Sequence, residues 1–72
     1  MTKFIFNDDE VEQDQIRELA DNLKRNGFGV EVRHGWVVEI EDEMNAIDLK
    51  NILELIDDTI GLDFVDHINV NR

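Results

Sequence analysis

The sequence predicts a small α+β domain with the element order β-α-β-β-α-β. Two segments repeat apolar residues at helical spacing, and four short runs alternate apolar and polar residues as strands do. With right-handed crossovers, this order gives the split βαβ plan called ferredoxin-like. It is a two-layer sandwich with both helices on one face of a small antiparallel sheet, and residues 1–72 form a single domain.

The first strand is expected at residues 3–7, with Phe4 and Phe6 on one face and Ile5 on the other. A helix is expected from about residue 9 to 26, capped by Asn7 or Asp8 and ended by the pair Asn26-Gly27. Its apolar residues recur at i, i+3, i+4 and i+7, which predicts one buried stripe. The stripe consists of Ile16, Leu19, Ala20 and Leu23.

A hairpin is expected next, and its apolar residues choose the register. A two-residue turn at His34-Gly35 would divide these apolar residues between the two faces of the sheet. A three-residue loop at 33–35, with Gly35 in the left-handed conformation, keeps them on one face. The expected cross-strand pairs are then Val32 with Trp36, Val30 with Val38, and Phe28 with Ile40.

The segment DEMNAID (42–48) opens the second helix, with Asn45 and Asp48 at capping-box spacing. Gly61 is expected to end it. The expected core stripe of this helix is Leu49, Leu53, Ile56 and Ile60. In the last strand, one face is expected to carry Phe64, Ile68 and Val70, and the other His67, Asn69 and Asn71. Without this strand the fold would be a three-stranded sheet with two helices.

Charge dominates the composition, with 18 acidic residues against 7 Lys and Arg and a net charge of −11. Surfaces that bind nucleic acid or anionic membranes need Lys and Arg to replace counterions, so neither is an expected direct ligand. A basic protein partner is expected instead. The chain has no Cys, and its first apolar run is too short for a signal peptide or a membrane span, so we expect a soluble, cytoplasmic protein.

The residue inventory argues against catalysis. Ser, Cys and Tyr are absent, and the hydroxyl groups belong to Thr2 and Thr59. His34 and His67 lack the partner spacing of a zinc site. The acidic stretches 7–10 and 57–63 do not follow the calcium-loop pattern. We therefore expect no enzyme activity, no cofactor and no dedicated metal site, with weak divalent binding left open.

The sheet face opposite the helices is the candidate protein-binding surface. If the first and third strands are neighbours, Ile5 and Val37 form a small apolar centre inside a charged rim, as binding surfaces commonly do. The rim is expected to consist of Glu31, Glu39 and Glu41. Trp36 has two interpretations, as a core residue near the end of the sheet or as a half-buried interface anchor.

Two functional hypotheses follow, and a third interpretation gives the acidic surface no role beyond solubility or salt adaptation. Glu39 and Glu41 would lie about 6.8 Å apart on a strand, and acids one helical turn apart about 6 Å apart. Those spacings are of the order of phosphate separations along a nucleic-acid strand. In size, acidity and lack of catalytic residues, the chain resembles the small DNA-mimic inhibitors that phages direct against nucleases, polymerases and CRISPR effectors (anti-CRISPR proteins). The alternative is a regulatory or assembly domain that forms a homodimer through its open sheet face.

Overall fold

The computed structural model describes residues 2–70, and for Val70 only the backbone. Its elements are β1 (Thr2–Phe6), α1 (Gln13–Arg25), β2 (Val30–Arg33), β3 (Val37–Ile40), α2 (Ala46–Thr59), the short 3₁₀ helix η1 (Leu62–Phe64) and β4 (Val65–Val70). The predicted element order is therefore confirmed, including the last strand.

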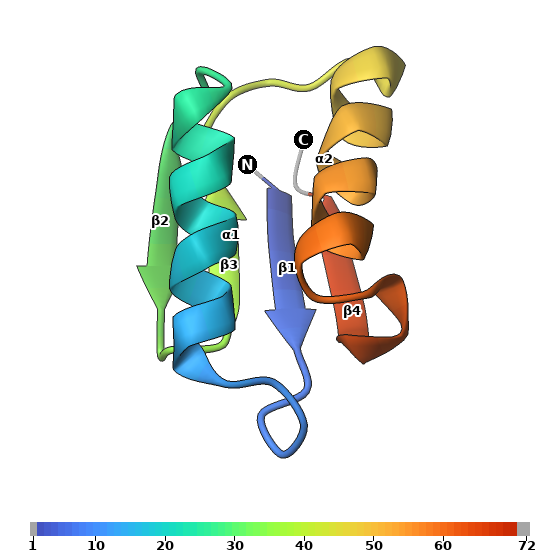
Figure 1. Cartoon of the computed structure of the whole chain (residues 1–72). Helices are drawn as coiled ribbons and strands as arrows, with labels where there is room; N and C mark the ends of the chain where they lie inside the picture. Colours follow the sequence, from blue (N-terminus) through green and yellow to red (C-terminus); the bar gives the residue numbers. More distant parts are fainter. Residues whose placement is uncertain (1, 71–72) are drawn as a thin grey trace.

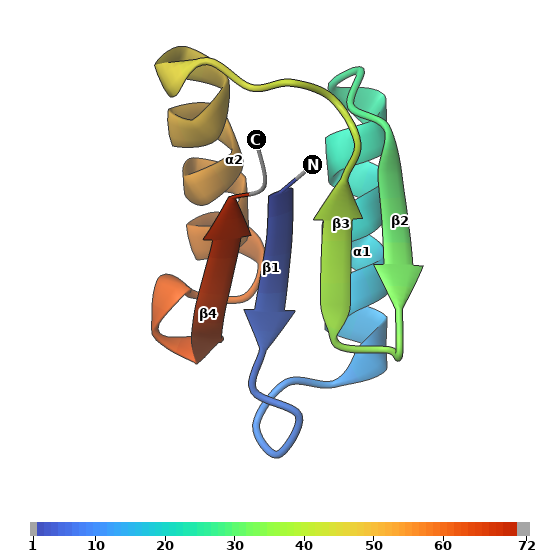
Figure 2. The same cartoon turned by 180° about the vertical axis from the view of Figure 1, so that it is seen from behind.

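The strands form one antiparallel sheet in the order β2-β3-β1-β4. Both helices lie on one face of this sheet, and the other face is open (Figures 1 and 2). β1 and β3 occupy the centre of the sheet. The connection through α1 leads from β1 past the position of β3 to β2, and the connection through α2 leads from β3 past β1 to β4. Ile5 and Val37 are consequently direct cross-strand partners.

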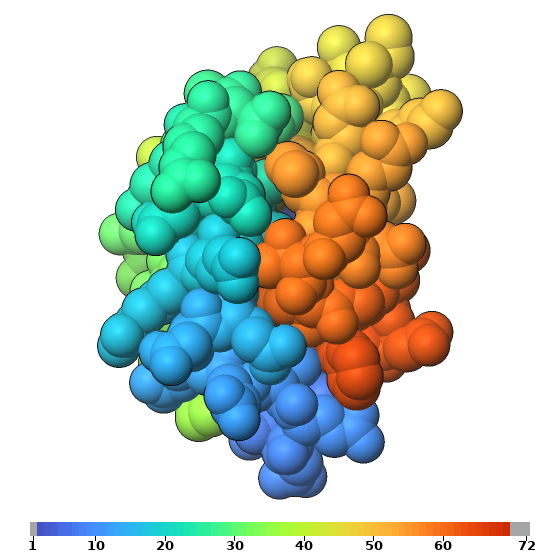
Figure 3. Space-filling view, viewed as in Figure 1, coloured from blue at the N-terminus to red at the C-terminus, as the bar shows by residue number. Residues whose placement is uncertain are grey.

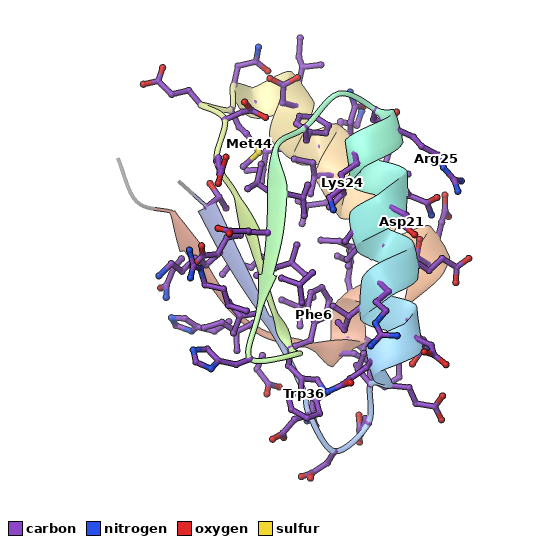
Figure 4. The ribbon with its side chains drawn as sticks, turned by 90° about the vertical axis from the view of Figure 1, so that its left-hand side faces the viewer. Phe6, Asp21, Lys24, Arg25, Trp36 and Met44 are labelled. Carbon is purple, nitrogen blue, oxygen red and sulfur yellow. The ribbon has the colours of Figure 1, made fainter. Side chains whose placement is uncertain are left out.

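The core lies between the sheet and the helices. The predicted stripe of α1 is confirmed, since Ile16, Leu19, Ala20 and Leu23 are all buried. Seen edge-on, Phe6 lies between the sheet and α1, whereas Arg25 points away from the sheet (Figure 4). The other buried apolar side chains come from the strands, the β1–α1 loop and α2: Phe4, Phe6, Val11, Val38, Ile40, Ile52 and Ile56.

α1 begins later than the sequence predicts. Asn7 caps a turn instead of the helix, because its side chain accepts a hydrogen bond from the backbone N–H of Asp9 at 2.9 Å. The helix cap is Glu12, which forms a capping box with Gln15. The expected C-terminal end is confirmed: Gly27 has φ +91°, and the N–H of Phe28 donates to the carbonyl of Leu23.

The hairpin register differs from the prediction by two residues. The observed pairs are Val30↔Ile40, Val32↔Val38 and Arg33↔Val37, so the loop is His34-Gly35-Trp36. Gly35 has the predicted positive φ of +79°, but His34 also has a positive φ of +56°. Two successive positive φ values are typical of a type I′ turn. A shift of two residues preserves the alternation, and the apolar residues stay on the helix-covered face.

The core stripe of α2 is also rotated from the prediction. Its fully buried residues are Ile52 and Ile56, while Leu49, Leu53 and Ile60 are partly buried at the core's edge. The predicted cap is confirmed, since the Asn45 side chain accepts from the N–H of Asp48. Gly61, with φ +115°, follows the end of the helix.

β4 contains a bulge that changes which side chains face the core. Ile5 pairs with His67 and Phe6 with Val65, so Asp66 is the extra residue. Phe64, which we expected in the strand, belongs to η1. The predictions for the side chain of Val70 and for Asn71 lie outside the described residues.

Candidate binding surfaces

The open sheet face is a small grid of two rows. The strand pairings align Arg33, Val37, Ile5 and His67 in one row. They align Glu31, Glu39, Lys3 and Asn69 in the other. Ile5 and Val37 are half-buried at the centre, as the sequence predicts for the apolar part of this surface.

Glu39 is the buried charge of this face. Its side chain is only 4% exposed, and it contacts two cations: Arg33 Nε at 2.7 Å and Lys3 Nζ at 3.4 Å. Arg33 also donates through Nη2 to Glu31 at 2.9 Å. One guanidinium therefore bridges two carboxylates that lie directly opposite each other and would otherwise repel. The network ties β1, β2 and β3 together on the face that has no helix.

The same contacts control the protonation of Glu39. The hydrogen bond from the Arg33 guanidinium holds the pKa of the Glu39 carboxyl below its usual value, Arg33 and Lys3 also act through their charges, and burial opposes the shift. The pKa of Arg33 is raised, first by its hydrogen bond to Glu39 and then by the charges of Glu31 and Glu39. Glu39 and Arg33 therefore both stay ionised at neutral pH.

The five residues expected at the protein-binding surface do not have equal access to a partner. Ile5, Val37, Glu31 and Glu39 lie together on the open face. Glu41 follows the end of β3 and is exposed, with its N–H donating to the Gly29 carbonyl at 2.9 Å. Because Glu39 is covered and ion-paired, it is the carboxylate least available to an external cation.

The excess negative charge lies outside the open face. On that face Glu31 and Glu39 are balanced by Lys3 and Arg33. Among residues 2–70, the acids of α2 form no ion pair, and its last turn contains two acids and no base. Apart from Glu39 and the half-buried Asp48, the described carboxylates are all exposed.

Trp36 fits neither of the two interpretations fully. It is half-buried in the hairpin loop, and its indole N–H donates to the carbonyl of Val11 at 3.1 Å. Its own carbonyl accepts from the N–H of Phe6 at 2.9 Å. Figure 4 shows it at one end of the sheet, beside the β1–α1 loop. Trp36 therefore fastens the hairpin to the segment that precedes α1.

Two hollows lie along α2, and sequence reasoning found neither. A polar one of about 450 Å³ separates the end of α1 from α2 (Figure 3), and it is lined by Asn26, Phe28, Asp48, Asn51, Glu54, Leu55 and Asp58. An apolar groove of about 360 Å³ is lined by Leu49, Lys50, Leu53, Glu54, Asp57 and Leu62. Leu49 and Leu53, which the sequence predicts in the core stripe of this helix, line the second hollow instead.

Comparisons with protein families, curated proteins and solved structures found no match for this chain. Within residues 2–70, no group of three or more His, Asp or Glu side chains is arranged to hold a metal ion. No helix in that range is long and apolar enough to cross a membrane.

Proposed function

We propose that this protein is a non-enzymatic binding module that docks on a basic, nucleic-acid-handling protein and presents carboxylates where nucleic acid would present phosphates. The supporting observation is the division of charge over the surface. Basic side chains neutralise the carboxylates of the open face, whereas the acids of α2 are left without an ion pair in residues 2–70. Unpaired exposed acids are the groups that a basic groove can contact at little desolvation cost.

The helix spacing fits this role. Glu54 and Asp58 are exposed one turn apart on α2, which separates them by about 6 Å along the axis. That distance is of the order of the phosphate spacing on one nucleic-acid strand. A rigid helix holds both carboxylates in place, so binding requires little additional ordering. The proposal therefore places the phosphate-like groups on α2 and not on Glu39.

A competition experiment between this protein and duplex DNA tests the proposed function. The chain is immobilised and used to capture binding proteins at low salt, and duplex DNA is then added. We expect a captured protein with a basic groove to be displaced by DNA, and the double variant Glu54→Lys/Asp58→Lys to capture less of it. Glu31→Lys/Glu41→Lys has the same net charge and serves as the control. If DNA displaces nothing and both variants behave alike, the DNA-mimic function is wrong.

A second function is favoured by one observation on the open face. Ile5 and Val37 are cross-strand partners at its centre, surrounded by a charge-balanced set of residues. A two-fold interface needs a self-complementary patch, which such a face can provide where an acidic one cannot. The alternative is therefore a regulatory or assembly domain that dimerises through the open face.

We also propose that the fold of this protein is ferredoxin-like, since the strand order and crossovers follow the split βαβ arrangement.

Sedimentation separates the two functions. If the open face is a dimer interface, Val37→Lys should convert the dimer into a monomer. Ile47→Lys introduces the same charge on α2, at a side chain that is 71% exposed, and should leave the dimer intact. A wild-type protein that sediments as a monomer at all accessible concentrations would exclude the dimer.

A further inference from the structure

The apolar groove beside α2 is an exposed surface with no partner inside the described chain. Its apolar lining consists of Leu49 and Leu53 of α2 and Leu62 of η1. Leu62 is 42% exposed, and together with the half-buried Leu49 and Leu53 it makes a small apolar patch. Figure 1 shows the cause: the chain turns back beneath the end of α2 through residues 61–64 before it enters β4.

The geometry of the groove suits a helix. Leu49 and Leu53 are one helical turn apart, so the apolar lining contributed by α2 repeats at about 6 Å along the helix axis. The side chains that cover one face of a second helix repeat at the same interval. An amphipathic helix can therefore lay its apolar stripe along the groove, a common mode of peptide recognition.

The charge of the rim decides what kind of helix fits. Glu54 and Asp57 line the groove against a single Lys50, and Asp58 and Asp63 are exposed nearby in the sequence. Acids in the last turn of a helix face the negative end of its dipole, so Asp57 and Asp58 lower the stability of α2. Their placement is unfavourable for folding and favourable for a cationic ligand.

We propose that this groove receives a basic amphipathic helix of the partner protein. Leucine-like side chains of that helix contact Leu49, Leu53 and Leu62, and its flanking Lys and Arg pair with Glu54 and Asp57. The inference rests on the proposed function, because it assumes a basic partner. A second copy of this chain does not fit, since its own groove would bring acids against acids, and anionic lipids and nucleic acid are repelled for the same reason.

The test uses defined peptides in place of the unidentified partner. The first is a helical peptide with leucines on one face and lysines on its flanks. The second has the same composition in scrambled order, and the third carries glutamate in place of lysine. Binding is measured by isothermal titration at low and at moderate salt. Methyl NMR shifts of the leucines report where each peptide binds.

We expect the amphipathic basic peptide to bind best and to shift the methyl groups of Leu49, Leu53 and Leu62. Leu62→Ser should weaken this binding about tenfold, because the peptide loses contact with one of the three leucines that line the groove. Ile47→Ser is the matched control, since Ile47 is exposed on the same helix but does not line the groove. It should leave the affinity unchanged, and melting curves of both variants verify that they fold.

A second pair of variants tests the rim. Glu54→Lys/Asp57→Lys should weaken the basic peptide and reduce the salt dependence of its binding. Glu18→Lys/Asp21→Lys changes net charge equally on the exposed side of α1 and should have a much smaller effect. Equal effects of the two double variants would mean that the peptide senses overall charge and not this groove.

The outcomes distinguish failure of the groove as the docking site from failure of the proposed function. If the scrambled basic peptide binds as well as the amphipathic one, or Leu62→Ser has no effect, the groove is not the docking site, although binding to basic proteins survives. If the glutamate peptide binds as well as the lysine peptide, the rim does not select the partner. If no basic peptide binds, the proposed function and the groove both fail.

Discussion

Glu39 shows how one buried carboxylate can organise a sheet face. A carboxyl whose pKa is lower in the folded than in the unfolded chain stabilises the fold above its unfolded pKa. That contribution disappears as the pH falls through the folded pKa. The pKa of Glu39 is lowered from an ordinary 4.5, chiefly by the hydrogen bond from Arg33.

We therefore predict that Glu39→Gln lowers the melting temperature at pH 7, and that the difference from wild type narrows as the pH falls below about 4. Thermal melting of both proteins across this pH range measures the difference. Glu31→Gln removes the same charge from an exposed carboxylate that also contacts Arg33, and it should produce a smaller difference. If the difference in melting temperature between wild type and Glu39→Gln does not change with pH, ionisation of Glu39 does not stabilise the sheet.

The hairpin loop contains a second residue-scale effect. His34 has a φ of +56°, a conformation that costs most residues energy but that Asn tolerates, particularly before Gly in a type I′ turn. We predict that His34→Asn raises the free energy of unfolding by about 0.5 kcal/mol. His67→Asn makes the same exchange on a strand and should give no gain. Urea unfolding of both variants measures the effect, and equal values would contradict the backbone explanation.

At the scale of elements, the two helices carry opposite charge in their last turns. α1 has Asp14 in its first turn and Lys24 and Arg25 in its last, which complements the helix dipole. α2 has an acid in its first turn but no base in its last, where Asp57 and Asp58 stand instead. The C-terminal end of α1 is therefore stabilised by its charges, whereas the C-terminal end of α2 is destabilised by them.

We predict that Asp58→Lys raises the free energy of unfolding by about 0.5–1 kcal/mol, whereas Asp14→Lys lowers it by a similar amount. The substitution and the change in net charge are identical, so relief of general repulsion cancels in the comparison. Chemical denaturation of both variants gives the two values. The helix-end explanation is wrong if both substitutions move stability in the same direction by the same amount.

The limits of sequence reasoning are clearest for the hairpin and α2. Alternation fixed which residues of the hairpin face the core, but a two-residue shift leaves alternation unchanged. The bonds of Trp36 to Val11 and Phe6 connect distant segments, and no local pattern reports them. In α2 the wide apolar arc allowed more than one stripe, and packing on the sheet selected Ile52. The capping box of α1 has Glu12 in place of the usual Ser, Thr, Asp or Asn, so the sequence pattern does not announce it either.

The candidate site was partly accessible from sequence for the same reason. Strand order placed Ile5 beside Val37, so the apolar centre of the open face followed from topology. The burial of Glu39 did not, because it depends on Arg33 and Lys3 reaching it from neighbouring strands. The groove beside α2 depends on η1, which no periodic pattern announces.

At the scale of the whole molecule, the net charge of −11 resides on a body with principal extents of 30 × 22 × 19 Å. At 0.01 M salt the screening length is about 30 Å, so every charge acts on every other, whereas at 0.15 M it is about 8 Å. Salt also weakens the ion pairs of the open face. Because unpaired acids outnumber these pairs, relief of repulsion should dominate.

We predict that the melting temperature rises as sodium chloride is increased from 0.01 to 0.15 M. The variant Asp57→Asn/Asp58→Asn has two fewer charges and should show a smaller rise, and sucrose at matched osmolality separates screening from general solute effects. Differential scanning calorimetry measures the melting temperature of the wild type in salt, of the variant in salt, and of the wild type in sucrose. A melting temperature that stays flat or falls with salt would mean that the acids do not strain the fold.

The strand order also has a consequence for how the chain matures during synthesis. β1 is made first, yet it lies between β3 and β4, so neither neighbour exists when it leaves the ribosome. At about 5–20 residues per second, the chain needs several seconds to extend from β1 to the end of β4. Until β3 (Val37–Ile40) has been made, Phe4 and Phe6 have no strand to pair with, so the apolar face of β1 is exposed in the first part of that interval.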